Sequence, residues 1–66
     1  MRTNEPKQVG QIIEELPGAH YLVKVGEKNV RAYLSGKMHI HHISVVVGDR
    51  VELIVAGDVG RITRRL

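Results

Sequence analysis

The chain contains no cysteine, no phenylalanine and no tryptophan, and it has only two tyrosines among its 66 residues. The lack of cysteine excludes disulfides and thiolate metal ligands, as is usual for proteins of a reducing compartment. No apolar stretch approaches the roughly 18 residues that span a bilayer. The polar start of the sequence has no apolar run of the kind found in signal peptides. We therefore expect a cytoplasmic protein.

Without large aromatic residues, the core must be aliphatic. Valine, isoleucine and leucine supply nearly all of the apolar bulk, and β-branched residues at this density favour strands over helices. A domain of this length buries only about 60% of the surface that its unfolded chain exposes, which leaves no room for a large internal active-site cavity. We predict one domain over residues 8–66, preceded by a flexible polar tail over residues 1–7.

Several short segments show the spacing of strands, with turn residues between them. In the second, third and fourth segments, apolar residues recur with a period of two. The first segment places apolar residues on both of its faces, which is typical of a strand that bends and serves two sheets, and Gly10 would permit the bend. The segments are 9–16, 20–25, 30–34, 50–55 and 59–64.

Residues 35–43 lose this alternation, and their apolar residues take helical spacing. Ser35 is a suitable N-cap, so we predict a short helical turn between the third and fourth strands. Five strands from so few residues cannot protect the edges of an open sheet unless the sheet closes on itself. The pattern predicts an all-β, five-stranded oligonucleotide/oligosaccharide-binding barrel, with an SH3-like barrel as the alternative.

Basic residues exceed acidic ones, which gives a net charge of +3 and a pI near 9.7. A polyanion such as nucleic acid suits this surface, although many small basic proteins bind none. Arg61, Arg64 and Arg65 lie close to the end of the sequence, where they either contact phosphates or are simply solvated. Arg31 and Tyr33 share the outer face of the third strand. Arginine binds phosphate and tyrosine stacks on bases, but an ordinary solvated face is the alternative.

Three histidines, His39, His41 and His42, follow one another closely. They would ligate a metal, contact RNA or form a plain exposed loop. The chain has no cysteine, and no carboxylate lies between Glu27 and Asp49. Because no third ligand is obvious, we expect no metal site and no other cofactor.

The sequence also offers no catalytic grouping. The adjacent carboxylates Glu14 and Glu15 point to opposite faces of a strand. Ser35 and Ser44 have histidines nearby, but no carboxylate is placed to orient such a histidine. We expect no enzymatic activity.

Three motifs follow one another along residues 9–64, namely Ser35-Gly36-Lys37-Met38, Gly48-Asp49-Arg50-Val51 and Gly60-Arg61-Ile62. Their order and spacing resemble those of bacterial translation initiation factor one. The resemblance implies an oligonucleotide-binding barrel without enzymatic activity, present as a monomer. It also implies a protein that occupies the aminoacyl site of the small ribosomal subunit, contacts its ribosomal RNA and cooperates with the other initiation factors.

By this resemblance, the loop 37–42 and the basic C-terminal strand lie against RNA. Cationic side chains would neutralise phosphates, whereas Tyr33 and His39 would stack on bases or form hydrogen bonds with them. Met38 belongs to the matching motif but would serve equally well as a plug for the core. The predicted RNA-binding residues are Arg31, Tyr33, Lys37, Met38, His39, Arg61 and Arg64.

The chain departs from the family pattern in this loop, where histidines and Ile40 replace the usual arginine and lysine, and in a shorter connection between the last two strands. Each lost cation removes a phosphate contact and predicts weaker salt-sensitive binding. Two other functions remain open at this point. One is a general single-stranded nucleic-acid chaperone, which the scarcity of rings disfavours. The other is a protein-interaction module that docks a partner through Ile40 and exposed strand edges.

Overall fold

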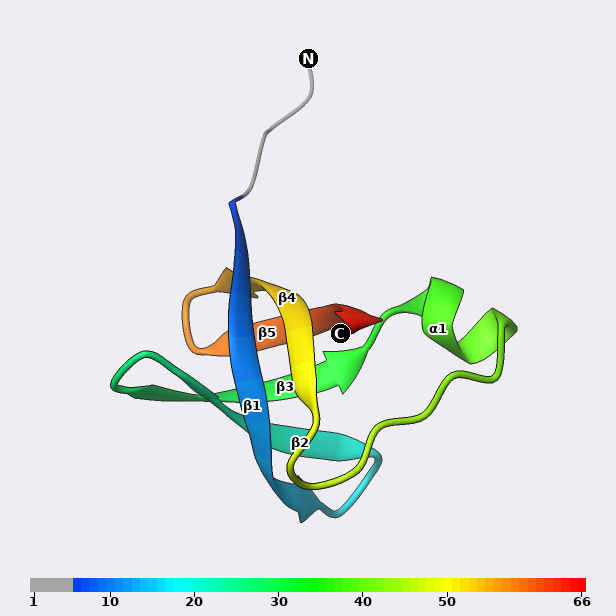
Figure 1. Cartoon of the computed structure of the whole chain (residues 1–66), viewed down its shortest axis with the longest axis horizontal. Coiled ribbons are helices and arrows are strands. Elements are labelled where there is room, and N and C mark those ends of the chain that lie inside the picture. Colours follow the sequence, from blue (N-terminus) through cyan, green and yellow to red (C-terminus); the bar gives the residue numbers. More distant parts are fainter. Residues whose placement is uncertain (1–5) are drawn as a thin grey trace.

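A computed structural model describes residues 6–66 of the protein (Figure 1). All five predicted strands and the predicted helical turn are present, although β1 begins at Lys7, one residue before the predicted start of the domain. The rest of the predicted tail, apart from Pro6, lies outside the described residues. Among residues 6–66, no helix has the length and apolar character that crossing a bilayer demands. The elements are β1 (Lys7–Leu16), β2 (His20–Val25), β3 (Lys28–Leu34), α1 (Gly36–Ile40), β4 (Arg50–Ala56) and β5 (Val59–Arg65).

The five strands form one closed barrel in the order β1-β2-β3-β5-β4. β3 and β5 run parallel, and every other neighbouring pair is antiparallel. Helix α1 lies beside the ends of β3 and β5, at the right of Figure 1. A closed barrel of this order with a helix between β3 and β4 is the oligonucleotide/oligosaccharide-binding fold, so the predicted fold class is confirmed.

The interior is aliphatic, as the composition predicts. In β3, Val30, Ala32 and Leu34 point inward, while Arg31 and Tyr33 between them are exposed. The same period of two buries alternate residues of β2 and β4. The buried hydrophobic residues are Ile12, Tyr21, Val23, Val30, Ala32, Leu34, Met38, Val45, Val51, Leu53 and Ile62.

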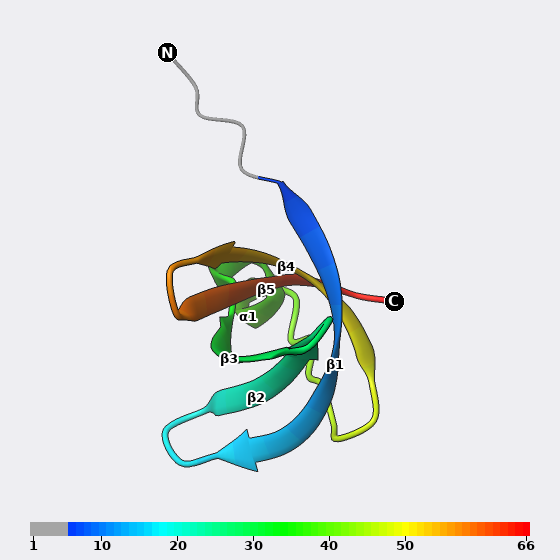
Figure 2. The ribbon, with the colours of Figure 1, turned by 90° about the vertical axis from the view of Figure 1, so that its left-hand side faces the viewer.

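β1 pairs with two strands, as its mixed apolar pattern predicts. Residues 7–11 pair with β4, and residues 11–16 pair with β2. A register shift between Ile12 and Glu14 marks a bulge in the pairing with β2. Such irregularities bend a strand, and Figure 2 shows β1 curving around the barrel.

Glycine is required at position 10 of β1 because the neighbouring atoms leave no room for a side chain. A Cβ atom here would lie 2.5 Å from Val23 Cγ1 and 2.8 Å from the carbonyl oxygen of Lys24. We expect Gly10→Ala to lower the free energy of unfolding by about 1–3 kcal/mol, the usual cost of overpacking, as measured by urea unfolding. Gly36→Ala is the control, because a Cβ there meets no atom within 4 Å. Wild-type stability of Gly10→Ala would contradict the close packing at this position.

Candidate nucleic-acid interface

The outer face of β3 and β5 carries several of the predicted residues. Tyr33 is 41% exposed and lies directly opposite Arg61 of the parallel strand β5. Opposite residues of neighbouring strands point to the same face, so a ring and a guanidinium group stand side by side there. Arg31 is exposed on the same face of β3, opposite Val59. A shallow hollow of about 160 Å³ beside the ring is lined by Tyr33, Ile54, Ala56, Val59, Gly60 and Arg61.

A bulge in β5 brings Arg64 to the same face as Arg61. In a regular strand, residues three positions apart point to opposite faces. Here the register between β4 and β5 shifts, so that Arg61 lies opposite Ile54 and Arg64 lies opposite Glu52, with Thr63 skipped. Ile54 and Glu52 share the outer face of β4, and both arginines therefore point outward.

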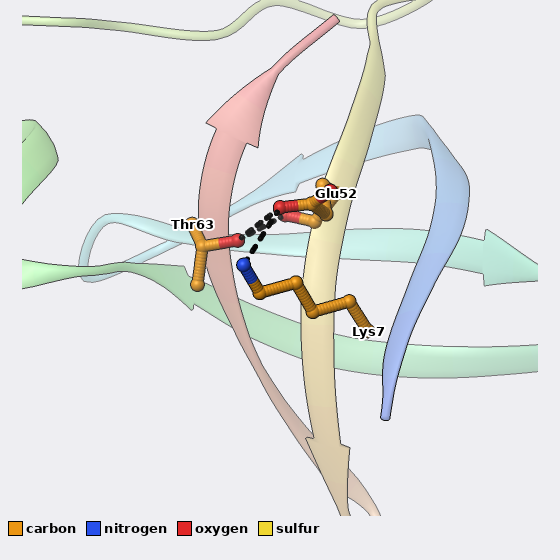
Figure 3. Close-up of polar contacts among 3 residues, drawn as sticks. All are labelled: Lys7, Glu52 and Thr63. Atoms are coloured by element: carbon orange, nitrogen blue, oxygen red, sulfur yellow. Dashed lines mark hydrogen bonds and ion pairs between the residues drawn. The ribbon is translucent and has the colours of Figure 1, made fainter. Parts of the chain in front are cut away.

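Glu52 is the carboxylate of this region, and two neighbours engage it (Figure 3). Lys7 Nζ lies 3.7 Å from Glu52 Oε1. The Thr63 hydroxyl donates to Glu52 Oε1 at 3.3 Å and to the Glu52 carbonyl oxygen at 3.2 Å. The contact between Lys7 and Glu52 is the only ion pair within residues 6–66. Arg61 and Arg64 form none there, so their charges are available for a ligand.

Helix α1 positions Lys37 at the end of β5. The Ser35 hydroxyl accepts a hydrogen bond from the Met38 backbone N–H at 3.4 Å and caps the helix, as predicted. The Ser35 backbone N–H donates to the Ile62 carbonyl oxygen at 2.9 Å, which ties the start of α1 to β5. The groove between α1 and β5, of about 520 Å³, is lined by Lys7, Ser35, Gly36, Lys37, Glu52, Arg61, Thr63 and Arg64.

A second groove adjoins the first, and Lys37 and Arg64 line both of them. His41 lines the second groove because it follows Lys37 by one helical turn. Arg65 also lines it, and its Nη1 donates to the Ser44 carbonyl oxygen at 3.3 Å. This groove, of about 510 Å³, is lined by Lys37, Met38, His41, Ile43, Thr63, Arg64 and Arg65.

The structure thus brings together Arg31, Tyr33, Lys37, Arg61 and Arg64, which we call the β3–β5 surface. Three further basic or histidine side chains line the grooves, those of Lys7, His41 and Arg65. The sequence placed His41 in the loop 37–42 and Arg65 in the basic C-terminal tip, but neither was among the residues predicted to bind RNA. For His41, the spacing of four from Lys37 was an available signal. For Lys7, no sequence signal existed, because its place beside Glu52 follows from the pairing of β1 with β4.

The other two predicted RNA-binding residues, Met38 and His39, are not part of the β3–β5 surface. The Met38 side chain is 1% exposed and belongs to the core cluster. Its burial favours the core role that the sequence left open over a direct contact with RNA. His39 is exposed but lines neither groove, since it lies two residues from Lys37 and so on another side of α1.

The other histidines form the exit from α1. His41 is the C-cap, and its N–H donates to the Lys37 carbonyl oxygen at 3.1 Å. His42 has a φ of 55° and turns the chain away from the helix. Across residues 6–66, no three histidine or carboxylate side chains gather in an arrangement that would hold a metal ion.

Fold and site together define the class, a small oligonucleotide/oligosaccharide-binding barrel with a basic outer face. No family model matches the chain. The crystal structure of YjeQ from Thermotoga maritima is similar, with a TM-score of 0.79 and 23% identity over 92% of this chain. The chain spans only 23% of the YjeQ chain, and this likeness shows the shared barrel alone.

A second solved structure is more informative. Translation initiation factor one from the Wolbachia endosymbiont strain TRS of Brugia malayi is 31% identical, with a TM-score of 0.79. The match covers 92% of this chain and 77% of that chain. The chain belongs to the family of translation initiation factor one, which confirms the resemblance drawn from the motifs.

Proposed function

We propose that this protein is a translation initiation factor that binds the small ribosomal subunit at the aminoacyl site, through ribosomal RNA, and assists assembly of the initiation complex. Family membership supports the role in initiation. The observation that carries the RNA contact is the alignment of Tyr33, Lys37, Arg61 and Arg64 on one face of the barrel. The other initiation factors would be its partners, and the cytoplasm would be its place of action.

Binding would combine charge neutralisation with stacking. Lys37, Arg61 and Arg64 would contact phosphates, because arginine forms paired hydrogen bonds with phosphate oxygens and lysine supplies a compact charge. Tyr33 would provide the stacking plane, with Arg61 beside it. Arg31 and His39 would add contacts at the margins. The protein would act by occupying the site and rearranging RNA locally, which requires no covalent chemistry.

The two alternative functions fit this surface less well. A general single-stranded nucleic-acid chaperone relies on several stacking rings, and among residues 6–66 Tyr33 is the only exposed tyrosine. A module that docks a partner by strand addition requires a free sheet edge. The described strands close into a barrel in which each strand has a neighbour on both sides, so only short stretches, such as residues 12–16 of β1, remain paired on one side.

The proposal is tested by measuring binding of the labelled protein to purified small subunits, large subunits and free oligonucleotides over a range of salt concentrations. We expect saturable binding to small subunits whose affinity falls steeply as salt rises, because phosphate contacts release counterions. A transfer RNA bound in the aminoacyl site should compete. Equal binding to all three targets would favour the chaperone instead. A lack of salt-sensitive binding to small subunits would reject the proposal.

A further inference from the structure

A second basic region lies across the barrel from the β3–β5 surface, where β1 passes between β2 and β4. Gln11 of β1 lies opposite Lys24 of β2 and also opposite Arg50 of β4. All three residues are exposed. Since opposite residues in paired strands share a face, the three side chains form a row on the outside of the barrel. The row forms because Gln11 pairs with a residue of β2 on one side of β1 and with a residue of β4 on the other.

The row borders a hollow of about 440 Å³, which we call the β1 hollow. The Gln11 side-chain amide donates to the Gly48 carbonyl oxygen at 3.3 Å, which holds it beside the hollow. Neighbouring strands lie about 4.8 Å apart, so the Cα atoms of Lys24 and Arg50 are separated by roughly 10 Å, and both side chains can reach one bound group. The hollow is lined by Val9, Gly10, Gln11, Lys24, Gly26 and Arg50.

The charged side chains that line the β1 hollow are both cationic, Lys24 and Arg50. No carboxylate is among its lining residues. Asp49 and Glu52 lie within two residues of Arg50 in the sequence, and each of these carboxylates contacts another group. Glu52 pairs with Lys7, and an Asp49 carboxylate oxygen accepts the Val46 backbone N–H at 3.0 Å. Lys24 and Arg50 form no ion pair within residues 6–66, so their charges are available to an anion.

We propose that the β1 hollow binds the phosphate backbone of a second RNA segment, so that the barrel contacts RNA on two opposite sides. The inference rests on the proposed function. An ammonium group, a guanidinium group and an amide are donors suited to phosphate oxygens. A protein partner would need a buried apolar or aromatic anchor, and Val9 is the only exposed apolar side chain in the lining. With no ring present, the contact would not depend on base sequence.

The test compares Lys24→Gln and Arg50→Gln, singly and together, with Lys28→Gln. Lys28 is an exposed cation at the start of β3 that lines none of the grooves described above. On small subunits, each test substitution should flatten the logarithmic salt dependence of binding by about 0.7–0.9 per lost contact. Backbone footprinting of the ribosomal RNA should show two protected segments, and the double variant should lose only one of them. Lys28→Gln should keep both.

Two results would overturn the inference. One is a double variant whose footprint and salt dependence match those of Lys28→Gln. The other is weaker subunit binding with an unchanged RNA footprint, which would indicate an acidic protein ligand instead.

An NMR titration with a short oligouridine separates this inference from the proposed function, because it needs no ribosome. The backbone amides of Gly10, Gln11 and Gly26 should shift in the wild-type protein and stay unshifted in the double variant. If wild-type protein fails to bind small subunits, the proposed function fails, while these shifts still report on the β1 hollow. If the three amides do not respond to the oligouridine, the hollow does not bind RNA.

Discussion

Replacing Lys37, Arg61 and Arg64 together with alanine is expected to weaken binding to small ribosomal subunits by roughly a hundredfold. All three side chains are exposed and line the groove between α1 and β5. A net hydrogen-bond contribution of about 1 kcal/mol for each contact gives about 3 kcal/mol in total. Since each 1.4 kcal/mol corresponds to about a tenfold change in affinity, the loss should reach two orders of magnitude.

The salt dependence provides the sharper readout. Losing three phosphate contacts should flatten the logarithmic slope by about two to three units, whereas a general loss of stability would not alter the slope in this way. Lys28→Ala serves as the charge control, because it removes a cation outside both grooves of the β3–β5 region. A folded triple variant with the wild-type slope would show that RNA does not contact this surface.

The position of the cations explains how this chain retains a basic surface despite its unusual loop. The loop after Lys37 carries histidines where the family usually has arginine and lysine. In the structure, β5 supplies two of the four cations that line the groove between α1 and β5, Arg61 and Arg64, and the other two are Lys7 and Lys37. If RNA binds the β3–β5 surface as proposed, its affinity should depend more on strand β5 and less on the loop than the motif pattern alone implies.

The structural features that depend on neighbouring residues in the sequence could be predicted from the sequence. The period of two along β3 predicts which of its residues face the core, since successive strand residues point to opposite faces. Ser35 predicts the start of α1, because its hydroxyl can accept a helix N–H. The mixed pattern of β1 predicts a strand with two partners, and β1 does pair with both β2 and β4.

The structural features that depend on the register between strands distant in the sequence could not be predicted from the sequence. Simple alternation places Arg64 on the opposite face from Arg61, and only the shift that skips Thr63 returns it to the outside. The contact between Lys7 and Glu52 also depends on long-range pairing, as does the row through Gln11. The sequence therefore predicted the fold and named the five residues of the β3–β5 surface, but not how their side chains are brought together.

Met38→Ala is expected to lower the free energy of unfolding by about 2–5 kcal/mol, the usual cost of truncating a buried methionine. The Met38 side chain is 1% exposed and packs in the core cluster, and its carbonyl oxygen accepts the Ile43 N–H at 2.9 Å. Domains are typically stable by only about 5–15 kcal/mol, so this loss is a large part of the total. Urea unfolding measures it directly.

Met38→Leu separates a core role from an RNA contact. Leucine nearly conserves volume, so the cost in stability should stay below about 1.5 kcal/mol. Because the buried Met38 side chain anchors α1, the helix that also carries Lys37, Met38→Leu should keep wild-type affinity for small subunits, whereas Met38→Ala should loosen α1 and weaken binding as it destabilises the fold. Weakened subunit binding by a Met38→Leu variant of wild-type stability would instead assign Met38 to the RNA contact. In that event, α1 would have to move to expose this side chain on binding, because the core covers it in the free protein.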